Sequence, residues 1–174
     1  MGSDGTVVGD GRPDPIALAR ANWERAGWGG DIAVGMEAVT SVMRAHQIML
    51  ARVEHALKPF RLTFARFELL RLLAFSRRGA LPISRASARL QVHVSSVMHA
   101  IDRLERAGLV ERQPHPTDGR TTLVALTDAG RDTVAEATEA VNEVFADLGG
   151  AIGAADSEKL VAAIRVLRRE NGDF

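Results

Sequence analysis

The sequence predicts a mainly α-helical fold with one small β-hairpin. Over most of the 174 residues, apolar side chains recur every three or four positions, which is the spacing of helices that bury one face. Near residue 110 this period gives way to two short runs of alternating apolar and polar residues on either side of a turn-rich segment. That pattern is typical of two strands joined by a turn. Because aromatic residues make up only 5% of the chain, we expect an aliphatic core.

Two helices are predicted before residue 58. Residues 1–13 are rich in Gly, Asp and Pro and predict a disordered arm. Asp14 followed by Pro15 is typical of a helix start, and we expect this first helix to reach residues 29–30. A second, longer helix is expected over residues 31–57. Its apolar stripe has the alternating three-and-four spacing of a coiled-coil seam and comprises Met36, Val39, Met43, His46, Leu50, Val53 and Leu57.

Three shorter helices are predicted next, with N-caps at Thr63, Ser84 and His93. A short extended piece at residues 81–83 precedes the second of them. The third is expected to end before Gly108, since glycine commonly follows a helix C-terminus. One face of this third helix carries apolar residues at helical spacing, namely Val97, Ala100, Ile101 and Leu104.

The hairpin is expected from strands at residues 109–113 and 121–126. A long helix should follow, capped by Thr127 or Asp128 and interrupted at Gly149–Gly150 and at Gly153. The last helix is predicted to be capped by Asp156. Both carry apolar stripes, made of Val134, Ala137, Val141, Val144 or Phe145, and Leu148 in the first and of Leu160, Ile164 and Leu167 in the second.

Charge is distributed unevenly although the net charge is zero. Residues 58–120 hold 12 basic and 5 acidic residues, whereas residues 1–57 hold 5 and 7, and residues 121–174 hold 5 and 10. A basic centre between acidic ends is typical of a local nucleic-acid-binding face. A solvated charged surface is the alternative interpretation of the same pattern.

The helix over residues 94–107 and the hairpin have the order of a winged helix-turn-helix, in which a recognition helix enters the major groove of DNA. Small polar side chains near the start of this helix can approach base edges. The candidate DNA-binding residues are Ser95, Ser96, Met98, His99 and Arg103 on the helix, and Arg112 and Arg120 on the hairpin. Any amphipathic surface helix followed by a solvated turn would look similar.

The hairpin tip, Asp118-Gly119-Arg120, has its own predicted role. An arginine on a thin projection can enter the minor groove, where the negative potential is greatest. Asp118 is expected to support the wing by holding Arg120, or another arginine, through charge-assisted hydrogen bonds.

These residues resemble the MarR (multiple antibiotic resistance regulator) family. The resemblance is carried by the segments at 101–112, 118–120 and 124–130 and by the Leu62-Thr63 entry to a helix, and it extends over about residues 33–170. It implies a homodimer that binds a pseudo-palindromic operator in double-stranded DNA, usually as a repressor relieved by a small-molecule effector. The family commonly has Asp-Arg-Arg at the wing, whereas this chain has Gly119 in the middle position.

The resemblance also implies the organisation of the chain. It consists of a disordered arm (1–13), N-terminal helices that take part in dimerisation (14–57), a winged helix-turn-helix DNA-binding domain (58–127) and C-terminal dimerisation helices (128–174). A Trp on an extra N-terminal helix is similar to the urate-responsive subgroup of the family. A ligand pocket lined by Trp23, Phe67 and Glu68 is therefore a hypothesis, with plain packing as the alternative role of Trp23. This subgroup also has an arginine in its recognition helix. The corresponding position in this chain is held by His99 or Ala100, so the arginine is missing.

The sequence carries no motif of other classes of function. No nucleophile elbow, phosphate-binding loop or paired catalytic carboxylates are found, so we expect no enzyme and no cofactor. The five histidines lack metal-ligand spacing, so no metal site is expected. The chain has no Cys and no apolar run near the roughly 20 residues that span a bilayer, which favours a cytoplasmic protein without a membrane partner. The remaining alternative is a winged-helix protein-interaction module without DNA binding. The operator, the effector, the regulated genes and the direction of regulation are not given by the sequence.

Overall fold

The computed structural model describes residues 12–118 and 120–174. Most of the predicted disordered arm, and Gly119 at the hairpin tip, lie outside the described residues. Contacts divide the chain into two units, residues 1–49 and 50–174. The long helix α2 (Asp31–Leu57) begins in the first unit and ends in the second.

The first unit is helical, as predicted. Helix α1 (Pro15–Arg25) is capped by Asp14, whose carboxylate accepts a hydrogen bond of 2.9 Å from the backbone N–H of Ile16. It ends earlier than predicted because Gly27 adopts a φ of +90°, which a right-handed helix does not allow. The rings of Trp23 and Trp28 meet edge to face, with centroids 5.3 Å apart. The predicted bounds of α2 are confirmed.

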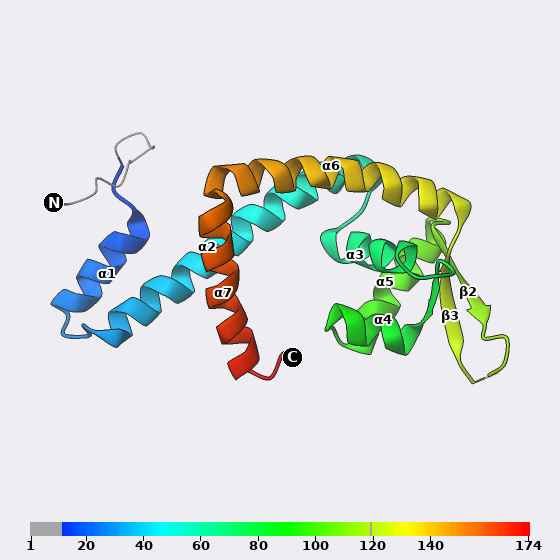
Figure 1. Ribbon diagram of the computed structural model, residues 1–174, viewed down its shortest axis with the longest axis horizontal. Coiled ribbons are helices and arrows are strands. Elements are labelled where there is room, and N and C mark those ends of the chain that lie inside the picture. Colours follow the sequence, from blue (N-terminus) through cyan, green and yellow to red (C-terminus); the bar gives the residue numbers. More distant parts are fainter. Residues whose placement is uncertain (1–11, 119) are drawn as a thin grey trace. The chain divides into compact units, whose positions relative to one another are not determined.

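The second unit contains the predicted winged helix-turn-helix, which is confirmed (Figure 1). Its elements are a 3₁₀ turn η1 (Lys58–Phe60), α3 (Phe64–Ala74), β1 (Ala80–Pro82), α4 (Ile83–Leu90), α5 (Val94–Arg106), β2 (Val110–Pro114) and β3 (Thr122–Leu126). The sequence predicted two strands, but the sheet has a third. Strand β1 pairs with β3 antiparallel, Leu81 opposite Val124, and gives the order β1-β3-β2.

The core of this unit lies between α3, α5, the sheet and the first half of α6 (Asp128–Ile152). The predicted inner face of α5 is buried, with Val97, Ile101 and Leu104 at most 1% exposed. They pack in one cluster with three fully buried leucines of α3, which are Leu69, Leu70 and Leu73. The exposed face of α5 is thereby fixed on the opposite side.

Three predicted helix features are wrong. Ser84 is not an N-cap, because α4 begins at Ile83 directly after Pro82. Gly149–Gly150 do not interrupt α6, since a glycine costs only about 1 kcal/mol inside a helix and the helix continues to Ile152. The interruption predicted at Gly153 is confirmed, because the helix ends there at a φ of +83°. Helix α7 (Ala154–Glu170) starts directly after it, so Asp156 lies within the first turn instead of capping it.

Large apolar side chains remain exposed on the long helices. In α6 and α7 they include Phe145, Ile152, Leu160, Val161, Val166 and Leu167, each at least 39% exposed. Helix α7 has no buried residue. In α2, Val39 and Met43 are 61% and 62% exposed. Among the described residues, none of the helices has the length and apolar character needed to cross a bilayer.

Candidate nucleic-acid interface

The exposed face of α5 begins at a histidine cap. His93 precedes the first turn, and its Nδ1 accepts from the backbone N–H of Ser95 at 3.3 Å and lies 2.7 Å from the Ser95 hydroxyl oxygen. The other candidate residues of the recognition helix, Ser96, Met98, His99 and Arg103, are also exposed. This face has short side chains at its start and cations farther along, which is what a helix that approaches base edges requires.

The basic residues of the central segment, which includes α5 and the hairpin, are mostly without carboxylate partners. Of the 12 between residues 58 and 120, Arg112 is the one that forms salt bridges in the part of the chain that the structure describes. By contrast, Arg20, Arg52, Arg131, Lys159 and Arg168 outside this segment all pair with acidic side chains. The central cations therefore present uncompensated charge, as a surface for a polyanion does.

Arg112 differs from the other predicted DNA contacts. Its half-buried guanidinium donates to Asp102 and to Glu105, both on α5. Hydrogen bonding from Arg112 holds the pKa of Asp102 below its usual value, so the charged pair persists to a lower pH than an ordinary aspartate would allow. Arg112 thus ties the hairpin to the recognition helix with its charge already compensated.

The hairpin tip is held by Asp118, but not in the predicted way. Its carboxylate accepts from the backbone N–H of Arg120 at 3.0 Å and from the Thr121 hydroxyl at 2.7 Å. These two bonds lower the pKa of Asp118. The aspartate therefore shapes the turn through the backbone, and no guanidinium contact to it is found among the described residues. The exposed Arg120 side chain projects without a carboxylate partner in that same part of the chain.

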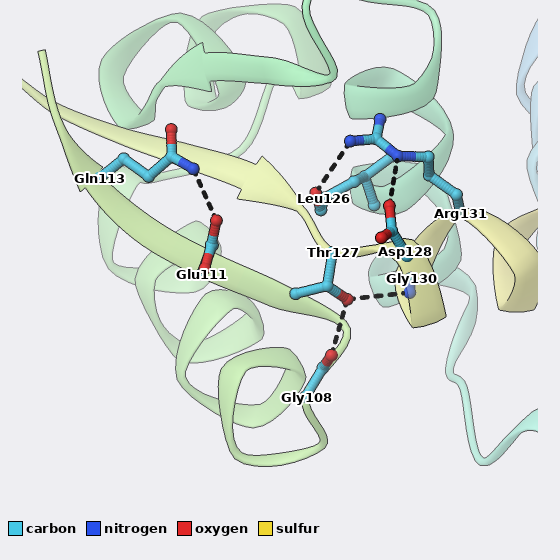
Figure 2. A network of polar contacts seen from close by, with 8 residues as sticks. All are labelled: Gly108, Glu111, Gln113, Leu126, Thr127, Asp128, Gly130 and Arg131. Atoms are coloured by element: carbon cyan, nitrogen blue, oxygen red, sulfur yellow. Dashed lines mark hydrogen bonds and ion pairs between the residues drawn. The ribbon is translucent and has the colours of Figure 1, made fainter. Parts of the chain in front are cut away.

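The recognition helix, the hairpin and α6 meet at one junction (Figure 2). The Thr127 hydroxyl donates to the Gly108 carbonyl at 2.7 Å and accepts from the Gly130 N–H at 3.0 Å. The backbone N–H of Thr127 donates to the Leu109 carbonyl at 3.2 Å. A Cβ atom on Gly130 would lie 1.9 Å from that carbonyl oxygen. The first turn of α6 is thus seated directly on the link between α5 and β2.

The chain is similar to known proteins in both sequence and structure. The family model described as "MarR family" matches residues 62–122. The crystal structure of Sco5413, a MarR family transcriptional regulator from Streptomyces coelicolor, is 45% identical, covers 80% of this chain and 96% of its own, and superposes with a TM-score of 0.71. The chain belongs to the MarR family.

Two transcriptional repressors are also similar to the chain. The transcriptional repressor CouR, solved bound to a 23-mer DNA duplex, is 26% identical over 73% of this chain and 89% of its own, with a TM-score of 0.66. The HTH-type transcriptional repressor IacR of Pseudomonas putida is 29% identical over 102 residues. That match covers 59% of this chain and only 60% of the length of IacR.

The three residues predicted to line an effector pocket are divided between the two units. Phe67 is 6% exposed and belongs to the core of the winged-helix unit. Glu68 lies next to it on α3, and its partial burial raises the pKa of its carboxyl. Trp23 belongs to the first unit, where it packs on Trp28. The structure gives Phe67 a packing role, and the pocket stays a prediction.

Sequence reasoning missed Asp102 and Glu105 as a pair that holds the hairpin, and Thr127 with Gly130 as a junction. A signal for the first was present, because Asp102 and Glu105 lie three residues apart and so share one side of a helix. Their partner Arg112 is close only after the chain turns at Gly108, whose φ is +73°.

Proposed function

We propose that this MarR-family chain is a homodimeric transcriptional regulator that binds a pseudo-palindromic operator in double-stranded DNA and acts as a repressor. The observation that carries the proposal is the uncompensated positive charge around the exposed face of α5. The exposed apolar faces of α6 and α7 support a dimer, since contiguous apolar surface of this kind marks an interface. The resemblance to CouR and IacR supports the repressor role.

The recognition helix and the hairpin should fail in different ways. Arg120→Ala is expected to weaken operator binding by about 1–3 kcal/mol and to reduce the salt slope by about 1 per subunit, because each subunit loses one cationic contact. His99→Ala is expected to change which half-site sequences bind best, because His99 faces base edges. Operators selected from random DNA with the wild type and both variants would measure this, together with salt titrations of each complex.

The outcome also separates DNA binding from the alternative role as a protein-interaction module. A DNA-binding protein loses affinity for random duplex as salt rises, whereas an interaction module shows no binding at any salt concentration. If Arg120→Ala changes the base preference and His99→Ala changes nothing, the two roles are assigned wrongly.

A small-molecule effector is part of the proposal, with a pocket that includes Trp23. Ligand binding there should change the intrinsic fluorescence of the edge-to-face pair Trp23–Trp28. Trp23→Phe should weaken both the binding of the effector and its release of the operator. Trp28→Phe, in the more exposed partner, is the matched control and should preserve both. Unchanged binding and release in Trp23→Phe would make Trp23 a packing residue only.

A further inference from the structure

We propose that two basic clefts of the winged-helix unit each hold a backbone phosphate of the operator, so that Arg66 and Arg85 set the register of the protein on DNA. This rests on the DNA binding proposed above. The first cleft, called the α3–α5 cleft, lies between the start of α3 and the exposed face of α5. The second, called the α4–hairpin cleft, lies between the start of α4 and the hairpin.

The α3–α5 cleft has a volume of about 350 Å³ and is lined by Thr63, Ala65, Arg66, His99, Ala100 and Arg103. Two guanidinium groups and one imidazole therefore line a single hollow. The Nε of Arg66 donates to the Thr63 hydroxyl at 3.1 Å, which orients the guanidinium and leaves its two terminal nitrogens available. His99 and Arg103 are predicted DNA contacts, so the cleft is continuous with the recognition face.

The α4–hairpin cleft has the same kinds of polar group although other elements build it. Its volume is about 440 Å³, and its polar lining includes Arg78, Ser84, Arg85 and His115. Thr121 also lines it, and this residue is adjacent to Arg120 at the hairpin tip. The cleft therefore lies beside the predicted minor-groove contact, as the α3–α5 cleft lies beside the predicted major-groove contacts.

The charge of the residues that line the two clefts indicates which class of ligand they bind. Neither cleft is lined by an Asp or Glu, and none of the four arginines in them forms a salt bridge with a described acidic residue. A third hollow behind the hairpin also contains two arginines, Arg78 and Arg131, but Glu111 and Asp128 line it as well. Guanidinium groups without competing carboxylates match the oxygens of a phosphodiester. Such contacts fix the register of a protein on the duplex without reading its sequence.

The salt dependence of binding to the selected operator tests the proposal. Arg66→Gln and Arg85→Gln each remove one phosphate contact per subunit, and so two per dimer. Each should therefore reduce the slope of log K against log salt by about 1.8, and the double variant by about 3.6. The base preference should stay that of the wild type. Arg25→Gln, at the end of α1, removes the same charge outside the winged-helix unit and should leave the slope unchanged. Equal slopes for the wild type and both cleft variants would overturn the proposal.

Operators in which one phosphate has lost its charge can locate the contacts of Arg66 and Arg85 directly. Operators carrying a single methylphosphonate should bind the wild type less tightly at particular positions. Arg66→Gln should lose this sensitivity at one position in each half-site, and Arg85→Gln at a different one. A wild-type interference pattern in both variants would contradict the proposal even if their affinity falls. If inorganic phosphate stabilises the wild type but not the variants while that pattern is unchanged, the clefts bind a small anion instead. If the wild type binds no DNA at low salt, the proposed function itself fails.

Discussion

Gly130→Ala is expected to destabilise the winged-helix unit by about 3 kcal/mol, the upper range for overpacking a buried site. The added Cβ would lie 1.9 Å from the carbonyl oxygen of Leu109 and 2.9 Å from its carbon. Both neighbours are backbone atoms, so no side-chain rotation relieves the contact. The first turn of α6 must move away from the link between α5 and β2, which also breaks the bonds of Thr127.

Gly149→Ala is the matched control in the same helix. No atom lies within 4 Å of a Cβ at this position, so alanine should stabilise α6 by about 0.5–1 kcal/mol. Urea unfolding of both variants and the wild type measures the two effects. A Gly130→Ala protein as stable as the wild type would show that α6 is not seated on Leu109.

Replacing both Leu160 and Ile164 with glutamate is expected to convert the dimer into monomers. Burying a leucine or isoleucine contributes about 1.5–3 kcal/mol, and a dimer contains four of these side chains. Leu160 is 40% exposed within its own subunit, so only the exposed part of each side chain is buried by the partner. The proposed dimer should therefore lose at least about 2 kcal/mol, before the cost of burying the new charges is added, which raises its dissociation constant more than about tenfold. Sedimentation over a range of concentrations measures this change.

The control for this variant carries two charges elsewhere on α7. Ala155 and Ala162 are exposed and lie on the opposite side of the helix by their spacing from Leu160. Ala155→Glu with Ala162→Glu should leave the dimer intact. A soluble Leu160→Glu, Ile164→Glu protein that remains a dimer would exclude this stripe from the interface.

Features fixed by local spacing could be predicted from the sequence. The bounds of α2 follow from a continuous apolar stripe, and the inner face of α5 follows from helical periodicity. The third strand could not be predicted, because Leu81 lies opposite Val124 only after forty residues of chain have folded. The wrong caps at Ser84 and Asp156 have a related cause. Pro82 and Gly153 are the residues at which the chain enters α4 and α7, so both helices begin before the residue with the favourable capping side chain.

From the sequence we could predict which residues of the site are exposed, but not which side chains they contact. His99 and Arg103 lie on the exposed face that periodicity assigned to them. As a cation on the hairpin, Arg112 is a predicted DNA contact, yet it binds Asp102 and Glu105 across the turn. Which cations remain uncompensated depends on contacts between elements, and the spacing within one element does not contain that information.

The bonds of Thr127 make α6 a lever. Because one hydroxyl binds both the Gly108 carbonyl and the Gly130 N–H, the end of the recognition helix and the start of α6 turn together as a single body. Helix α6 has 25 residues, a length of about 37 Å at 1.5 Å per residue. If this body rotates by about 10° about the junction, the far end of α6 moves by about 6 Å from its original position. Conversely, if the far end of α6 lies in the proposed dimer interface, a shift of a few ångströms there is enough to change the angle at which α5 presents its side chains to a groove.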